Sequence, residues 1–319
     1  MKIELFFKSS AQLTGILDLI TERPLIFRSH PAFNIPNKMR DENLLPYAQQ
    51  ILERIPNGDV CVHYSLKNNK AKSVSEATDR FANYVASCHE LGVKEVLLVS
   101  GSSGGSQVKR KINTVSCLQY MRGMSYSLPP SFQLGAAFNP YYTCDSSNEL
   151  ERSRLVEKLL TGYISVLYLQ FGSNPTMLEQ NLEFVNSVVD REKVRVFGSV
   201  FLPSKQLIAR MKFRPWKGLL LSDEFLSGVA PAEGIVRDML RIYRAYNVTP
   251  IIETAFRTHS EAQYLEQLLE LQSVDANKAS VPIQCFNRQE EEKGGDVDVE
   301  GKEGCDDEDS HGKRRFTEI

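Results

Sequence analysis

The sequence predicts an α/β protein with a single (β/α)8 barrel, the TIM-barrel class, over residues 1–287. Eight strand-like segments alternate, mostly one for one, with helical segments over roughly 270 residues, which is the order that such a barrel needs. One segment, Val96–Val99, is apolar at every position, as is typical of a parallel strand buried on both faces. A dinucleotide-binding sheet would need G-x-G-x-x-G directly after its first strand. The glycine-rich segment Gly101–Gly105 has a different spacing and follows the fourth strand.

Strands are predicted where short apolar runs rich in β-branched and aromatic residues are bounded by turn residues. In chain order they span residues 2–8, 24–27, 59–64, 96–99, 132–138, 164–170, 194–201 and 249–254.

Helices are predicted where apolar residues recur every three or four positions. One of them begins at Ser73, which forms a capping box with Glu76, and ends at Gly92. In chain order the helical segments span residues 44–55, 73–91, 108–121, 149–160, 177–189, 204–211, 232–246 and 260–271, and residues 13–20 form a short apolar segment before them.

The composition is that of a soluble globular protein, with 42% hydrophobic and 24% charged residues among 319. No run of 18 apolar residues occurs, so we expect no membrane span and no membrane partner. The N-terminal residues lack the pattern of a signal peptide. Six cysteines lie far apart without a CxxC pair, which argues against a disulfide framework or a zinc ribbon. Cys61 is expected to be a buried small apolar residue, and we expect a cytoplasmic protein.

Residues 288–319 are predicted to be a disordered acidic tail, because they contain few apolar residues. From Gln289 to Ile319 there are twelve acidic and five basic residues, a charge of −7, which leaves about +5 on the remainder of the −2 chain. This weak positive charge suits an anionic small ligand and does not indicate nucleic acid. The sequence is compatible with a homo-oligomer.

Barrel enzymes carry their active sites at the C-terminal ends of the strands. Here those ends are rich in aromatic and neutral hydrogen-bonding residues, which suits a flat aromatic ligand or cofactor. They contain neither a metal-ligand cluster with zinc spacing nor an evident Ser-His-acid set, so no metal is predicted. The candidate positions are Glu4–Phe7, Arg28, Ser29, His63, Ser100–Gly105, Phe138–Tyr142, Gln170, Phe171, Phe201–Pro203 and Glu253–Arg257.

Glu4 is the most informative of these positions. It lies inside the first apolar run, on the face opposite Ile3 and Leu5. A carboxylate on the interior face of a strand is costly unless it has a partner or a function. The alternative is a solvated Glu4 close to the chain terminus.

Several segments resemble methylenetetrahydrofolate reductases, beginning with Ile3–Phe7, which is similar to their F-E-F-F signature. Further similarities follow in the same order: His63 to the His of P-H-L-T-C, Leu98–Ser102 to L-R-G-D, Ala136–Phe138 to A-A-Y, Glu151 and Lys158–Gly162 to an acidic position and K-x-x-x-G, Leu169–Phe171 to T-Q-F, and Gly198–Pro203 to P-G-I-L-P.

The resemblance implies a barrel that binds FAD and reduces 5,10-methylenetetrahydrofolate to 5-methyltetrahydrofolate with NADH or NADPH, in one-carbon and methionine metabolism. Glu4 would be the general acid that opens the five-membered ring of the folate. Apolar neighbours such as Phe6 would raise its pKa to about 6–7.

The resemblance also implies the binding residues. Gln170 would hydrogen-bond the pterin, Lys158 would neutralise a flavin phosphate, and Glu151 would accept from ribose hydroxyls. The implied cofactor-binding residues are His63, Ser100, Gly101, Ser102, Ala136, Phe138, Tyr142, Glu151 and Lys158, and the implied substrate-binding residues are Gln170 and Phe171.

One loop departs from the pattern of the family. Ser100-Gly101-Ser102 stands where Arg-Gly-Asp is expected, so Ser102 cannot supply the negative charge of the Asp. Two alternatives therefore stay open: a flavin-free folate-dependent methyl-transfer enzyme, and a catalytically inactive barrel that acts as a binding or regulatory protein.

Overall fold

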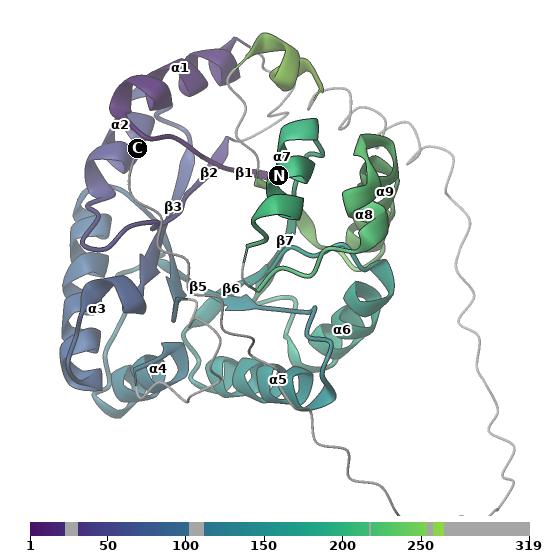
Figure 1. Cartoon of the computed structure of the whole chain (residues 1–319). Coiled ribbons are helices and arrows are strands. Elements are labelled where there is room, and N and C mark those ends of the chain that lie inside the picture. The colour runs from purple at the N-terminus through teal and green to yellow at the C-terminus, as the bar shows by residue number, and fades with distance from the viewer. Residues whose placement is uncertain (23–30, 102–111, 217, 254–257, 265–319) are drawn as a thin grey trace, which may run out of the picture. The chain divides into compact units, whose positions relative to one another are not determined.

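A computed structural model describes residues 1–22, 31–101, 112–216, 218–253 and 258–264. These residues lie in one compact unit, Met1–Val274. Its eight strands form a closed barrel in chain order, every neighbouring pair is parallel, and the helices surround the strands (Figure 1). The predicted fold class is confirmed. The predicted boundary between residues 287 and 288, and the acidic tail beyond it, lie outside the described residues.

The strands are short, as is usual for the inner wall of such a barrel. They are β1 (Lys2–Glu4), β2 (Ala32–Ile35), β3 (Asp59–Ser65), β4 (Glu95–Val99), β5 (Gln133–Phe138), β6 (Ile164–Leu169), β7 (Arg195–Val200) and β8 (Thr249–Glu253).

The outer layer includes nine α-helices and one 3-10 helix whose bounds both lie within the described part of the chain. They are α1 (Ser10–Thr21), α2 (Leu45–Arg54), η1 (Leu66–Asn69), α3 (Val74–Glu90), α4 (Thr114–Gly123), α5 (Asp145–Leu160), α6 (Pro175–Val188), α7 (Lys205–Phe213), α8 (Asp223–Ser227) and α9 (Val229–Ala245). Residues 259–264 are also helical.

The second strand differs from the prediction. The barrel uses Ala32–Ile35, which pairs with β1 through Phe33 and with β3 along its whole length. The segment predicted instead, residues 24–27, lies outside the described residues. β1 is also shorter than predicted and ends at Glu4.

The strands separate two apolar regions, because alternate side chains point to opposite faces. Ile3 and Leu5 belong to the larger region between the strands and the helices. The interior of the barrel holds a smaller cluster that consists of Cys61, Leu97, Val166, Tyr168, Phe197 and Ile251. Lys2 and Glu4 alternate with Ile3, so they point into the barrel. Cys61 is buried, as predicted.

A buried ion pair occupies the N-terminal end of the barrel interior. Lys2 is only 3% exposed. Its Nζ lies 2.7 and 2.8 Å from the two carboxylate oxygens of Glu95 and 2.5 Å from the hydroxyl of Tyr168. The hydroxyl of Tyr168 in turn donates to Glu95. Paired and hydrogen-bonded in this way, the two charges are tolerated inside the barrel.

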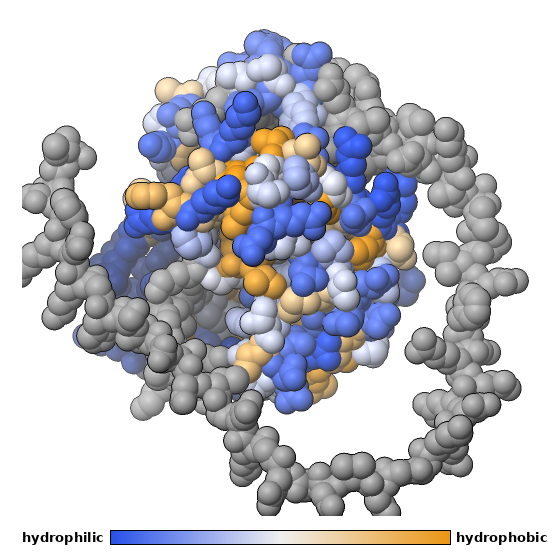
Figure 2. All heavy atoms as spheres, turned by 45° about the vertical axis from the view of Figure 1, so that its right-hand side comes forward, coloured by the Kyte–Doolittle hydropathy of each residue, from blue (hydrophilic) through white to orange (hydrophobic). Residues whose placement is uncertain are grey.

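The surface is ordinary for a globular protein. Figure 2 shows a central group of apolar residues with hydrophilic residues around it, a mixture that most protein surfaces share. Within the described segments, no helix has the length and apolar character that crossing a bilayer requires.

Candidate active site

Two carboxyl groups meet at the C-terminal end of the barrel. Glu4 ends β1 and Glu253 ends β8, and the two residues are in register where these strands close the barrel. Burial raises the pKa of Glu4 well above its usual value, and the neighbouring Glu253 raises it further, although Lys38 opposes the shift. Burial also raises the pKa of Glu253 from 4.5 to about 7. Two such groups cannot both ionise easily, so the pair retains a proton near neutral pH.

Ser199 and Lys38 flank this pair. The hydroxyl of Ser199, on β7, donates a hydrogen bond to Oε1 of Glu253, which favours the ionised form of that carboxyl. Lys38 follows β2, and burial lowers its pKa while Glu4 and Glu42 raise it. Its Nζ lies 4.4 Å from the ring centroid of Phe6. The ammonium group of Lys38 and the hydroxyl of Ser199 therefore lie near the negative charge of the pair.

His63 lies on the other side of Glu4. Its Nε2 is 3.7 Å from Oε2 of Glu4 and 3.1 Å from Nδ2 of Asn34. Burial, with Lys2 and Lys38 nearby, lowers the pKa of His63 to about 3, so the ring is neutral. Because Nδ2 of Asn34 can only donate, Nε2 accepts, and the proton of the ring is assigned to Nδ1. His63 is thus a polar neighbour of Glu4 rather than its counter-ion.

A cavity of about 300 Å³ borders Glu253. Its walls include the rings of Phe6, Phe201, Trp216 and Tyr264, and Arg210 and Gln206 lie at its polar side. The guanidinium carbon of Arg210 lies 5.0 Å from the ring centroid of Trp216. Apolar and aromatic walls with a few polar groups are typical of small-ligand sites.

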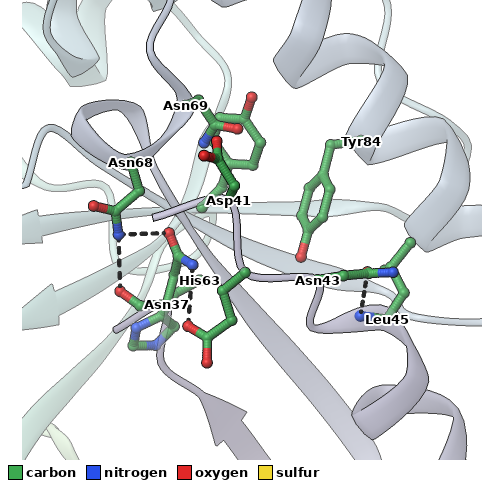
Figure 3. Close-up of a pocket in the computed structure, with 10 residues that line it drawn as sticks. Asn37, Asp41, Asn43, Leu45, His63, Asn68, Asn69 and Tyr84 are labelled. Carbon is green, nitrogen blue, oxygen red and sulfur yellow. Dashed lines mark hydrogen bonds between the residues drawn. The ribbon is translucent and has the colours of Figure 1, made fainter. Parts of the chain in front are cut away.

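A second cavity, of about 220 Å³, borders His63 and is drawn in Figure 3. Asparagine and tyrosine side chains line it, from the segment after β2, from β3, from η1 and from α3. The two cavities are therefore connected to the carboxyl pair through different residues, Glu253 in one case and His63 in the other.

The loop after β4 is described only in part, and Ser102 lies outside the described residues. The hydroxyl of Ser100 lies 3.1 Å from that of Thr114 and accepts a hydrogen bond from its backbone N–H. Gly101 has a φ of 80°. A Cβ atom there would lie 2.6 Å from Cβ of Lys67 and 2.8 Å from Oγ of Ser65. Local packing alone thus explains both residues.

Ala136 and Phe138, which the resemblance predicts to contact the cofactor, have side chains that face away from the barrel interior. Both side chains are fully buried and belong to the apolar region between strands and helices. Phe138 packs near Phe184 of α6, with ring centroids 6.3 Å apart. The inward positions of β5 are Gly135 and Ala137, so the two predicted residues point away from the barrel mouth.

Three other predicted residues lie together near the end of β5. Nζ of Lys158 donates to the carbonyl of Ala137 at 2.7 Å and lies 4.0 Å from Oε1 of Glu151. The same carboxylate oxygen accepts from the backbone N–H of Asn139 at 3.3 Å. Burial raises the pKa of Tyr142, and Glu151 contributes to that shift. Lys158 is 7% exposed, so its position is that of a structural lysine that holds the end of β5.

The two predicted substrate residues follow β6. Gln170 is partly buried, and its backbone N–H donates to the carbonyl of Phe138. Phe171 is 1% exposed, and its ring packs edge-on against Phe201 and Phe225. A direct contact between Phe171 and a substrate, as predicted, is therefore not supported by its position.

Three residues of this site were not singled out from the sequence, whereas Glu253 was among the candidate positions at the strand ends. Ser199 belongs to a predicted strand, but no local pattern shows that it meets Glu253. Asn34 lies on the strand that was not predicted, and Lys38 follows it. Within the described residues, no group of three or more His, Cys, Asp or Glu side chains is arranged to hold a metal ion.

Comparisons with known proteins add nothing about the reaction. No protein-family model matches the chain, and no curated protein is significantly similar to it in sequence. Similar solved structures include a GH18 chitinase from Pseudoalteromonas aurantia, with a TM-score of 0.47 and 11% identity over 85% of this chain and 99% of that chain.

Two further similar structures also have a TM-score of 0.47. One is a psychrophilic endo-β-1,4-xylanase of glycoside hydrolase family 10, with 10% identity over 80% of this chain and 86% of that chain. The other is a putative lyase/mutase from Burkholderia cenocepacia, with 14% identity over 89% of this chain and 88% of that chain. At these identities and TM-scores the likeness assigns no activity to this chain.

Proposed function

We propose that this chain is an enzyme in which Glu4 and Glu253 transfer protons to and from a small substrate at the barrel mouth. The observation that carries the proposal is the pair itself, two carboxyl groups in register whose pKa values are both raised. A carboxyl group that titrates near neutral pH is suited to act as a general acid or base. In this pair one member donates a proton while the other is ionised.

The cavity beside Glu253 supports a flat substrate with an anionic group. The partly exposed ring of Trp216 provides a stacking surface, and Arg210 provides a positive charge at the cavity edge. A reduced folate has these features, because it joins a pterin ring to a carboxylate tail. Together with the sequence resemblance, this chemistry leads us to propose folate-dependent one-carbon transfer, with Glu4 as the group that protonates the ring nitrogen.

The described residues do not fit FAD in the way that the resemblance implies. The amine of Lys158 is bound to a backbone carbonyl and lies near Glu151, so it is not available to a flavin phosphate. The side chains of Ala136 and Phe138 face the helices. We therefore derive no step through FAD, and we propose the flavin-free form of folate chemistry as the first candidate.

Flavin-dependent reduction of 5,10-methylenetetrahydrofolate by NADH or NADPH is the second candidate. One observation favours it: Glu4, the acid that this reaction requires, is buried and has a raised pKa, the direction that the resemblance predicts. Both candidates use the same carboxyl group and differ in whether a flavin accompanies it.

A titration with tetrahydrofolate, combined with visible spectra, separates the two candidates. Saturable binding of tetrahydrofolate by the purified full chain, with no uptake of added FAD, supports the first. A bound flavin that NADH or NADPH bleaches supports the second. If the protein binds neither tetrahydrofolate nor FAD, both candidates are wrong and a binding or regulatory role remains.

A further inference from the structure

The cavity that borders His63 has a lining unlike that of the cavity beside Glu253. We name it the asparagine pocket, because four asparagines and two tyrosines line it: Asn37, Asn43, Asn68, Asn69, Tyr64 and Tyr84. They come from the segment after β2, from β3, from η1 and from α3, and Figure 3 shows the asparagines and Tyr84 around one space. Its volume of about 220 Å³ equals about seven water molecules at about 30 Å³ each.

Hydrogen bonds within the protein orient the side-chain amides of Asn68 and Asn69, and these bonds use the nitrogen atoms of the two amides. Nδ2 of Asn69 donates to the carbonyl of Ser65 at 2.8 Å, and Nδ2 of Asn68 donates to the carbonyl and the side-chain oxygen of Asn37 at 3.4 and 3.0 Å. Backbone carbonyls only accept, so these orientations are unambiguous. The described residues make no hydrogen bond to Oδ1 of Asn68 or Asn69, and both atoms remain acceptors for a ligand.

The side-chain amide of Asn43 is oriented the other way, because its oxygen atom is the one that is hydrogen-bonded to the protein. Oδ1 of Asn43 accepts from the backbone N–H of Leu45 at 3.2 Å, as Figure 3 shows. A backbone N–H only donates, so Nδ2 of Asn43 is the group left for a ligand. The pocket thus offers both acceptors and a donor. Hydroxyl groups, which donate and accept at the same time, are the ligand groups that match such a mixture.

The charges around the pocket already have partners. Asp41 forms an ion pair with Lys70, with 2.5 Å between Oδ2 and Nζ. Oε2 of Glu42 accepts from the backbone N–H groups of Lys38 and Met39 at 2.8 and 3.0 Å. His63 is neutral, because its pKa is lowered to about 3. The described lining of the pocket includes no lysine or arginine, and its two carboxylates already hold Lys70 and backbone N–H groups, which favours an uncharged ligand.

The two tyrosines add an apolar wall and a polar group. The rings of Tyr64 and Tyr84 lie with centroids 4.9 Å apart and an interplanar angle of 49°. The hydroxyl of Tyr64 is buried and has no hydrogen-bond partner within the described part of the chain. A buried hydroxyl without a partner is unfavourable and gains from a ligand that hydrogen-bonds it.

We propose that the asparagine pocket binds an uncharged polyhydroxylated ligand no larger than a monosaccharide. The amides hold its hydroxyl groups, and the tyrosine rings contact its carbon atoms. His63 separates this ligand from Glu4 by one side chain, since the same imidazole borders the pocket and lies 3.7 Å from the carboxyl group. The inference does not depend on proton transfer at Glu4, so each can fail alone.

A titration of the ¹⁵N-labelled full chain with D-ribose and with D-glucose tests the proposal. We expect saturable shifts of the side-chain amide signals of Asn68 and Asn69 at millimolar concentrations of at least one sugar. Tetramethylammonium and inorganic phosphate serve as charged probes and are expected to leave these signals unchanged. No shift with either sugar up to about 50 mM, or a stronger response to a charged probe, would overturn the proposal.

Single substitutions test whether the sugar binds in the asparagine pocket. Asn68→Leu is expected to weaken binding at least about tenfold, because it removes one acceptor and leaves its sugar partner unsatisfied. Asn43→Leu provides a second variant at an exposed position, should Asn68→Leu not fold. Asn186→Leu, at an exposed position on α6, is the matched control and should bind as the parent does. Unchanged affinity in Asn68→Leu and Asn43→Leu would contradict the assignment.

Discussion

Glu4 and Glu253 are in register on the first and the last strand of the barrel, where β1 and β8 pair to close it. Glu4 is buried and Glu253 is partly buried, and the negative charge of Glu253 raises the pKa of Glu4. The two residues therefore act as one titrating unit that shares a proton. The pair is also the reason to regard the barrel mouth as a reaction site.

Replacing Glu253 with glutamine should change how stability depends on pH. The folded pKa of Glu253 is about 7, above its ordinary 4.5, so the folded state keeps a proton that the unfolded state loses between these values. This contribution to the free energy of unfolding is complete below pH 4.5 and is lost as pH rises through about 7. The full loss is about 3 kcal/mol at 1.36 kcal/mol per unit.

Urea unfolding between pH 4 and 8 measures this effect. The parent should lose stability as pH rises over that range, and Glu253→Gln should lose less. Glu53→Gln, at an exposed position on α2, should keep the slope of the parent. Equal slopes for the parent and Glu253→Gln would show that Glu253 is not the group responsible.

Replacing Glu4 with glutamine should abolish most of the proposed folate reaction while tetrahydrofolate still binds. Glutamine keeps the size of the side chain but cannot transfer a proton. General acid catalysis contributes about 10²–10⁴-fold in rate, so turnover should fall by at least about 100-fold. Steady-state rates together with a binding titration provide the measurement. Turnover equal to that of the parent would contradict a catalytic role for Glu4.

Replacing Lys2 with methionine should destabilise the barrel by about 3–5 kcal/mol, because Glu95 is then buried without its main cation. Arg195, 3.4 Å from Glu95, is half exposed and compensates only in part. Thermal or urea unfolding provides the measurement. The double variant Lys2→Met with Glu95→Gln should recover part of the loss, because it removes the unpaired charge. A single variant as stable as the parent would contradict this account of the ion pair.

Replacing Gly101 with alanine should destabilise the protein by about 1–3 kcal/mol, because the residue has a φ of 80° and a Cβ would approach Lys67 and Ser65 too closely. Gly15→Ala is the control, since it lies within α1 with nothing within 4 Å of the added Cβ. That change should be neutral or stabilising. If urea unfolding shows the same stability for both variants, packing does not explain Gly101.

The order of strands and helices was predictable because most elements carry a clear periodic pattern. Ser73 caps α3 as predicted and accepts from the backbone N–H of Glu76. The carboxylate of Glu76 accepts from the backbone N–H of Lys72 and not from that of Ser73, so the capping box is only half formed. β2 was missed because it has four residues, one of them Asn34, and prolines stand on either side. Such a segment has the local signals of a loop.

One residue of the site could be recognised from the sequence, but the contact between two residues far apart in the sequence could not. Glu4 interrupts an apolar run, and together with the predicted barrel and the residues at its strand ends this indicated a carboxyl group at a site. Its partner Glu253 is at the other end of the barrel sequence, and only closure of the sheet brings them together. The orientation of Ala136 and Phe138 was not predictable, because β5 is apolar on both faces and alternation does not tell which side chains point inward.

Infrared spectroscopy of the carboxyl groups tests the central claim most directly. The parent at pH 7 should show the C=O stretch of a protonated carboxylic acid, which disappears as pH rises and the shared proton is lost. Glu4→Gln and Glu253→Gln should each alter this band, while Glu53→Gln should leave it unchanged. A parent protein without a protonated carboxyl band at pH 7, or a band that neither substitution at the pair affects, would contradict the account.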